Sequence, residues 1–159
     1  MEGFILSLLI LANGFFVMAE LAVVSSRRST LRQRSEAGDG GAKAAYELAS
    51  SPSAFLSTVS VVITMISILS GAMGGAVLAA PVAERLVGWH VPKTVADPVS
   101  LALVVLIITV VSILFGELLP KRLALAHSET IAARLARPIQ AVAARSEEHT
   151  SELQSRFGI

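Results

Sequence analysis

The chain has 159 residues, of which 53% are hydrophobic and only 16% are charged. An ordinary soluble domain carries about 25% charged residues, so this composition excludes a typical soluble protein and predicts a membrane protein. The formal net charge is +1 and cysteine is absent, which excludes disulfides and thiolate metal sites. The apolar residues form about three blocks that could each cross a bilayer, so we expect one all-α integral membrane domain.

The first apolar block, residues 4–24, is long enough at 1.5 Å per residue to cross a hydrocarbon core of ~30 Å. We interpret it as a retained transmembrane helix, because it lacks the basic start and small-residue cleavage site of a signal peptide. Within it, Asn13 and Glu20 are seven positions apart and share one helical face. That face is expected to look into protein, and we favour interhelical hydrogen bonding over ion contact for Asn13.

A polar connection follows, in which four arginines lie within eight positions: Arg27, Arg28, Arg32 and Arg34. Such a cluster beside a membrane exit is typical of the cytoplasmic side, so the N-terminus is expected outside. Nucleic-acid binding is the weaker alternative, because no aromatic residues are interleaved with the arginines. The breaker run at residues 38–41 then predicts a turn before a short helix at about residues 42–49.

The second block, residues 55–80, carries a stripe of small and polar residues at spacings of four, three, four and three: Ser60, Thr64, Ser67, Gly71 and Gly74. Tight helix packing explains the stripe as a whole at least as well as ion binding does. The hydroxyls of Thr64, Ser67 and Ser70 and the backbone at Gly71 are the candidates for an ion site. Pro81 is expected to end this helix.

The third block, residues 99–119, ends in the motif Gly116-Glu117-Leu118-Leu119-Pro120-Lys121. A carboxylate at membrane depth is costly, which makes Glu117 a candidate functional residue. Pro120 has no N–H and would free the carbonyl of Gly116, so two kinds of oxygen ligand for a hard cation come close together. Lys121 and Arg122 follow at once and predict a cytoplasmic C-terminus after three crossings. Burial alone does not prove a site, because Glu117 lies near enough to the helix end to snorkel.

Beyond the third block we expect juxtamembrane helices over about residues 128–144, interrupted at Arg137-Pro138. Residues 145–155, Arg-Ser-Glu-Glu-His-Thr-Ser-Glu-Leu-Gln-Ser, match the translation of a widely used sequencing-library adapter. Residues 145–159 are therefore expected to be a non-native tail, and the natural protein is expected to continue differently after Ala144. A native helical tail is the weaker alternative.

Three segments together resemble the transmembrane domain of the cyclin-M/CorC family of magnesium transporters, often called hemolysin-like in bacteria. The first is Asn13-Gly14-Phe15-Phe16 with Ala19-Glu20-Leu21-Ala22 and Ser25. The second is Phe55-Leu56-Ser57-Thr58-Val59 leading to Ile63-Thr64, and the third is the Glu117 motif. Their order and their places on three predicted helices make the resemblance fairly specific, over nearly all of residues 1–144.

The resemblance implies a homodimer of three-helix subunits in the cell membrane, with a partly unwound site for a dehydrated magnesium ion and sodium-driven export. It further implies that Ser25, the segment from Thr64 to Ser70, and Glu117 supply the ligands. Val62 stands where many relatives have glycine and Ser67 where others have asparagine, so the register on the second helix stays open. The family also adds a nucleotide-binding regulatory module and a small C-terminal domain, which we expect to be missing from this chain.

Two other classes of function remain open. One is a non-conducting membrane anchor that dimerises a cytosolic nucleotide-binding module, in which case the polar stripe packs tightly without an ion. The other is an intramembrane enzyme, which is disfavoured because no His-Glu-x-x-His motif exists and His90 and His127 lie in connections. We therefore expect no enzyme activity, no covalent cofactor, no nucleic acid as a partner, and Mg²⁺ with Na⁺ as the transported ions.

Overall fold

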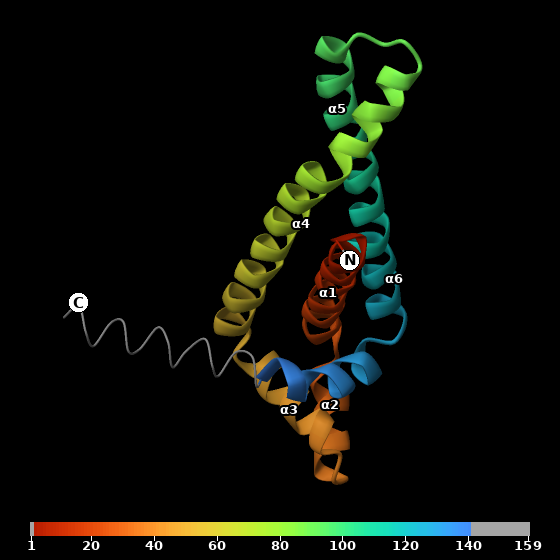
Figure 1. Ribbon diagram of the computed structural model, residues 1–159. Helices are drawn as coiled ribbons and strands as arrows, with labels where there is room; N and C mark the ends of the chain where they lie inside the picture. Colours follow the sequence, from red (N-terminus) through yellow and green to blue (C-terminus); the bar gives the residue numbers. More distant parts are fainter. Residues whose placement is uncertain (1, 141–159) are drawn as a thin grey trace, which may run out of the picture. The chain divides into compact units, whose positions relative to one another are not determined.

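A computed structural model describes residues 2–140, and within that range it contains helices and no strand (Figure 1). The order is α1 (Glu2–Ser25), α2 (Arg28–Glu36), α3 (Gly40–Ser50), α4 (Pro52–Gly88), α5 (Lys93–Ile113), the π-helical turn η1 (Leu114–Leu118) and α6 (Leu119–Ala126). Residues 128–140 are also helical. The expected non-native tail, residues 145–159, lies outside the described residues, as do the last four residues of the expected juxtamembrane helices.

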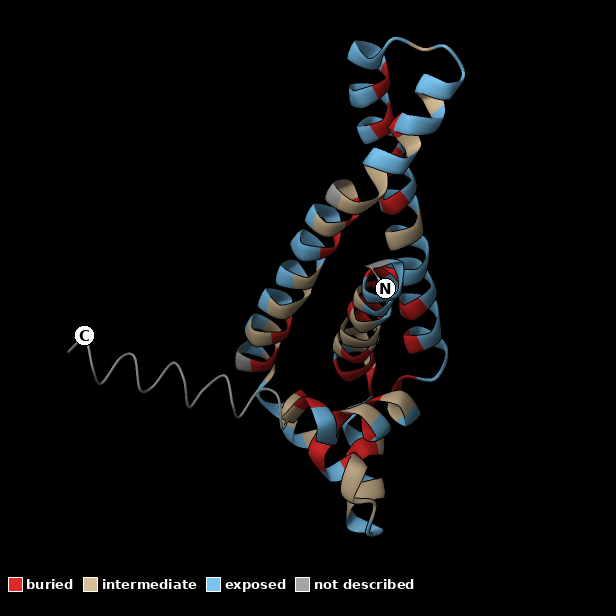
Figure 2. Cartoon of the chain, viewed as in Figure 1, coloured by how far each residue is buried: buried red, intermediate tan, exposed pale blue. Residues whose placement is uncertain are grey.

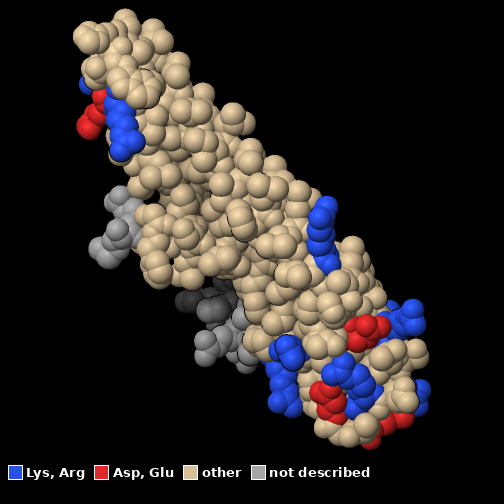
Figure 3. Space-filling view, turned by 90° about the vertical axis from the view of Figure 1, so that its right-hand side faces the viewer, with Lys and Arg blue, Asp and Glu red and all other residues tan. Residues whose placement is uncertain are grey.

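Three helical stretches are long and apolar enough to cross a membrane: Gly3–Ser25, Phe55–Gly88 and Lys93–Ala126. This confirms the prediction of an all-α integral membrane protein. Many of their apolar side chains are exposed, including Leu106 at 61% and Ile68 at 67% (Figure 2). On the face shown in Figure 3, few charged residues interrupt the long helices between the charged groups near their ends. Such a surface suits contact with lipid.

The helices form two compact units. The first unit comprises Met1–Phe15 and Ile63–Pro120, and the second comprises Phe16–Val62 and Lys121–Ile159. In the first unit, Leu6 and Ile10 of α1 pack against Val104 and Ile108 of α5 and form its buried core. The core is completed by three partly buried side chains, Leu78, Val82 and Val111.

The second unit is built on close contacts between small residues. A Cβ placed on Gly41 would collide with the carbonyl oxygen of Ala133, so α3 and the helix containing residues 128–140 approach closely. The contact surface is rich in buried alanines: Ala42, Ala44, Ala45 and Ala49 on α3, and Ala132, Ala133 and Ala136 opposite. Gln140 Nε2 adds hydrogen bonds to the Ala44 carbonyl (3.4 Å) and to Glu47 (3.2 Å).

Asp39 caps the N-terminus of α3 in this unit. Its Oδ1 accepts hydrogen bonds from the N–H groups of Gly41 and Ala42, both at 3.0 Å, and its Oδ2 accepts one from Arg34 Nη2 at 2.7 Å. The bond from Ala42, followed by that from Arg34, holds the pKa of the Asp39 carboxyl below its ordinary value. The Arg34 guanidinium also reaches the Glu129 carbonyl at 3.5 Å, which ties α2 to the helix of residues 128–140.

The structure corrects three expected helix ends. α4 continues through Pro81 to Gly88, and α5 begins at Lys93 with Pro98 inside it. The helix of residues 128–140 likewise passes through Arg137 and Pro138 without a break. A proline removes one backbone donor, and a long helix held by its other hydrogen bonds and by packing can continue past it.

Candidate functional site

The predicted disturbance of the helix near Glu117 takes the form of a π-helical turn. η1 spans Leu114–Leu118, and the N–H of Leu119 bonds to the carbonyl of Leu114, five residues back. Pro120 follows inside α6 and cannot donate to the carbonyl of Gly116, because proline lacks an N–H. π-helical turns are rare and frequently occur at functional sites. One extra residue per turn changes the direction in which Glu117 projects compared with a regular α-helix.

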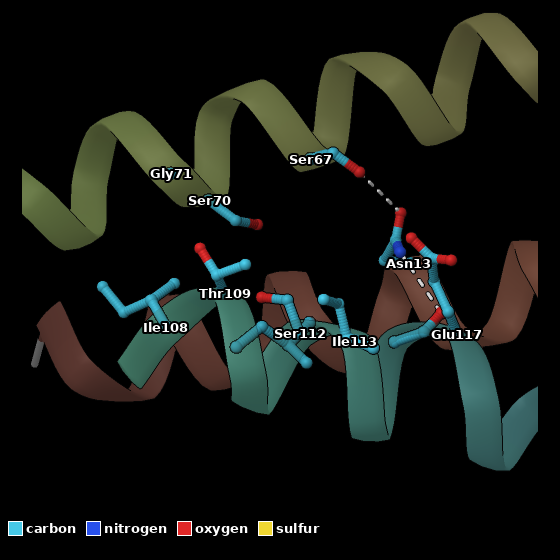
Figure 4. A pocket seen from close by; sticks show the side chains of 11 residues that line it. Asn13, Ser67, Ser70, Gly71, Ile108, Thr109, Ser112, Ile113 and Glu117 are labelled. Carbon is cyan, nitrogen blue, oxygen red and sulfur yellow. Dashed lines mark hydrogen bonds between the residues drawn. The ribbon is translucent and has the colours of Figure 1, made fainter. Parts of the chain in front are cut away.

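A pocket of about 200 Å³ lies in the first unit beside this turn. Its polar lining comes from Asn13 on α1, Ser67 and Ser70 on α4, and Glu117 on η1, among others, while isoleucines form its apolar wall. Figure 4 shows the side chains of Asn13 and Glu117 pointing toward α4, the helix that carries Ser67. The complete lining is Ile10, Asn13, Ser67, Ser70, Gly71, Ile108, Thr109, Ser112, Ile113, Gly116 and Glu117.

Asn13 joins the three segments that surround this pocket. Its Nδ2 donates a hydrogen bond to the Gly116 carbonyl at 3.3 Å, and its Oδ1 accepts one from Ser67 Oγ at 3.3 Å (Figure 4). The side chain is only 6% exposed. These bonds agree with the interhelical hydrogen bonding expected of Asn13. In the second unit, Ser60 of the same polar stripe donates to the Glu20 carboxylate at 3.2 Å.

The structure brings together four of the six predicted site residues. Ser67, Ser70, Gly71 and Glu117 all line the pocket. Thr64, one helical turn before Ser67 on α4, is exposed and is not among the lining residues. Ser25 is the last residue of α1 and belongs to the second unit, so its role as a ligand stays a prediction.

Thr109 and Ser112 on α5 line the pocket as well, although neither was a predicted site residue. The Thr109 hydroxyl donates to the Val105 carbonyl at 2.7 Å, which leaves its oxygen lone pairs able to accept or coordinate. A signal was present in the sequence, because residues 109, 112 and 116 follow at spacings of three and four and share one helical face. The predicted site drew on the polar residues of the second block and on Glu117, and did not include these two hydroxyls.

The donor set determines which chemistry this pocket can perform. Glu117 supplies one carboxylate and the serine and threonine hydroxyls supply neutral oxygens, which are ligands that hard cations prefer, while the amide of Asn13 is engaged in its two hydrogen bonds. Across the part of the chain that the structure describes, no three His, Cys, Asp or Glu side chains form a group that could hold a metal. A cation here would therefore rest on a single carboxylate and neutral oxygens. At about 30 Å³ per water, the volume would also admit several waters.

Three apolar candidate spans and a pocket that contains one carboxylate together define a multi-pass membrane protein. The family model described as the Cyclin M transmembrane N-terminal domain matches residues 4–144. The chain belongs to this family, which confirms the resemblance seen in the three motifs.

Individual relatives support this membership. The chain is 43% identical over 143 residues to the UPF0053 protein sll0260 of Synechocystis, covering 90% of this chain and 32% of that protein. It is 31% identical to the UPF0053 protein YrkA of Bacillus subtilis, over 85% of this chain and 31% of YrkA. It is 28% identical to the polyamine export protein of Haemophilus influenzae, over 78% of this chain and 28% of that protein. The chain thus spans about a third of the length of these curated relatives.

Proposed function

We propose that this chain is the membrane-embedded module of a divalent-cation transporter that binds Mg²⁺ at the Glu117 pocket and exports it, with Na⁺ as the coupling ion. The observation that carries the proposal is the position of Glu117, a carboxylate on a π-helical turn that lines a pocket with hydroxyl and amide oxygens inside candidate membrane spans. An ionisable residue in such a place is a functional candidate by default.

Neutral ligands around one carboxylate suit transport better than permanent storage. Mg²⁺ requires near-octahedral oxygens at about 2.1 Å and gives up its waters reluctantly. A site with one carboxylate can bind the ion and still release it, whereas several carboxylates would hold it more tightly. We expect Ser67, Ser70 and the Gly71 backbone to contribute on α4, together with Thr64 and Ser25 as the resemblance implies.

The exposed polar residues of the pocket support a homodimer. Ser67, Thr109 and Glu117 are exposed in the single chain although each lies in a candidate span. In a membrane such residues face protein or water and not lipid. A second copy that covers this face would shield them from lipid and leave a water-filled path to the pocket.

A polyamine is the second candidate substrate, because one relative is named a polyamine export protein. An alkylammonium ion would place its charge near Glu117 and its methylenes against Ile10, Ile108 and Ile113, which line the same pocket. A non-conducting anchor and dimerisation domain is the remaining alternative, and it requires no ion in the pocket.

The test is the replacement Glu117→Gln, which keeps the shape of the side chain and removes its charge. In titration calorimetry of the purified chain, we expect this variant to lose at least about tenfold in Mg²⁺ affinity. Glu84→Gln is the matched control, because Glu84 is an exposed carboxylate of α4 that does not line the pocket. A parallel titration with spermidine separates the two substrates, since tighter spermidine binding that depends on Glu117 would favour the polyamine. Unchanged binding of both cations in Glu117→Gln would leave the anchor as the better proposal.

A further inference from the structure

Pro120 leaves the backbone of the third candidate span with one hydrogen-bond donor fewer than a regular helix has. In a regular helix the residue four positions after Gly116 would donate its N–H to the Gly116 carbonyl, but proline has none. Gly116 is buried, and its carbonyl cannot take the regular α-helical bond because residue 120 is proline. The structure supplies a donor from another helix, since Asn13 Nδ2 of α1 bonds to this carbonyl at 3.3 Å.

The Asn13 side chain is held in one orientation from both ends. Ser67 Oγ donates to its Oδ1, which leaves the amide nitrogen directed at Gly116 (Figure 4). The side chain is 6% exposed, so water has little access to replace either bond. Its neighbour Gly14 brings the α1 backbone against the same turn. A Cβ on Gly14 would lie 2.8 Å from the Phe115 carbonyl oxygen and 3.0 Å from Pro120 Cγ.

We infer that Asn13 is a positioning residue, whose amide replaces the backbone donor that Pro120 removes and so holds the π-helical turn that presents Glu117 to the pocket. The inference rests on the proposed function for the role of Glu117. The inference goes further in one respect: the affinity of the pocket for a cation depends on Asn13, because this side chain fixes the geometry of η1. The dependence exists because residue 120 is proline.

The experiment is a double-mutant cycle between Asn13→Ala and Pro120→Ala, read by Mg²⁺ titration of the full chain. Asn13→Ala removes the donor and is expected to weaken Mg²⁺ binding about tenfold. Pro120→Ala restores a backbone N–H four residues after Gly116, so the same Asn13→Ala change in that background is expected to have less than about a threefold effect. An effect of equal size in both backgrounds would overturn the inference.

A matched control separates positioning from general stability. Ser100 is 1% exposed and donates one hydrogen bond to the Asp97 carbonyl at 2.8 Å, in the same unit but away from the pocket. Ser100→Ala therefore also removes a buried side-chain bond to backbone. It is expected to lower the melting temperature while leaving Mg²⁺ affinity unchanged. An equal loss of affinity in Ser100→Ala would assign the Asn13 effect to stability alone.

A second readout does not require any cation to bind. The chain has no cysteine, so a thiol introduced as Glu117→Cys is the only one in the protein. The rate at which a water-soluble methanethiosulfonate modifies it reports the position of residue 117. Asn13→Ala is expected to change this rate at least about threefold, and Pro120→Ala is expected to restore it. An unchanged rate would refute the inference even if Mg²⁺ binds, whereas absent Mg²⁺ binding with a changed rate would refute only the proposed function.

Discussion

Asp39 shows how one carboxylate outside the membrane spans organises a helix start. It accepts two backbone hydrogen bonds at the beginning of α3 and a third bond from Arg34, and all of these favour its charged form. A group whose pKa is lower in the folded protein than in the unfolded chain stabilises the fold at pH values above the unfolded pKa. That stabilisation disappears as the pH falls through the folded value.

We therefore expect the thermal stability contributed by Asp39 to be complete above about pH 4, near the ordinary aspartate pKa, and to be lost below it. Asparagine at this position keeps a capping side chain and removes the charge. The melting temperature of Asp39→Asn should lie below that of the parent at pH 7, and the two should converge as the pH is lowered below the ordinary aspartate pKa of about 4. A difference that stays constant over that whole range would contradict this account.

At the scale of the element, α3 packs closely on the helix of residues 128–140, and this closeness depends on one glycine. Gly41→Ala would place a methyl group against the Ala133 carbonyl, which is backbone and cannot easily move. We expect the substitution to cost about 1–3 kcal/mol of stability, as overpacking commonly does. The midpoint of thermal unfolding, followed by circular dichroism, measures this loss.

Gly40→Ala is the matched control for that prediction. The three atoms nearest to a Cβ at Gly40 all belong to the guanidinium end of Arg137, a flexible group that can shift aside. Alanine is also a better helix former than glycine, so this variant is expected to be neutral or slightly more stable. Equal destabilisation by both substitutions would show that the loss comes from the helix start and not from the contact with Ala133.

The existence of the long helices could be predicted from sequence because length and apolar composition are local properties. Their ends could not be predicted at Pro81 and Pro98, where local rules favour a break and the remaining hydrogen bonds override it. The π-helical turn was foreseen only as a loosened carbonyl at Gly116. Its form depends on contacts between distant parts of the chain, namely the amide of Asn13 and the close approach of Gly14.

The same distinction applies to the candidate site. Glu117 and Ser67 could be found because an ionisable residue and a polar stripe stand out within apolar helices. Thr109 could have been found from its spacing to Ser112 and Gly116. The pairing of Ser67 with Asn13 could not, since two helices far apart in sequence must first be brought together.

At the scale of the whole molecule, the arginines around α2 and the pair Lys121 and Arg122 predict which side of the membrane each connection occupies. We expect a single thiol introduced as Ser35→Cys to be modified only from the cytoplasmic side. A thiol introduced as His90→Cys, between α4 and α5, should be modified only from outside. Labelling of intact cells with a membrane-impermeant maleimide measures both. Modification of Ser35→Cys from outside alone would reverse the orientation and place Glu117 in the opposite half of the membrane.

The length of α4 has a consequence for the lipid that surrounds the protein. Its 37 residues rise about 55 Å, against a hydrocarbon thickness of ~30 Å. Tilts of up to about 40° shorten a helix too little to absorb this excess. Part of α4 must therefore stand outside the hydrocarbon, and its final turns, which include Glu84 and Arg85, are the polar part suited to do so. Bilayers with longer acyl chains can cover Val82 at this end of α4, but only until they reach Glu84 and Arg85, whose charges are costly at membrane depth. These two residues should therefore set the bilayer thickness above which hydrophobic mismatch begins to cost free energy at this end of the helix.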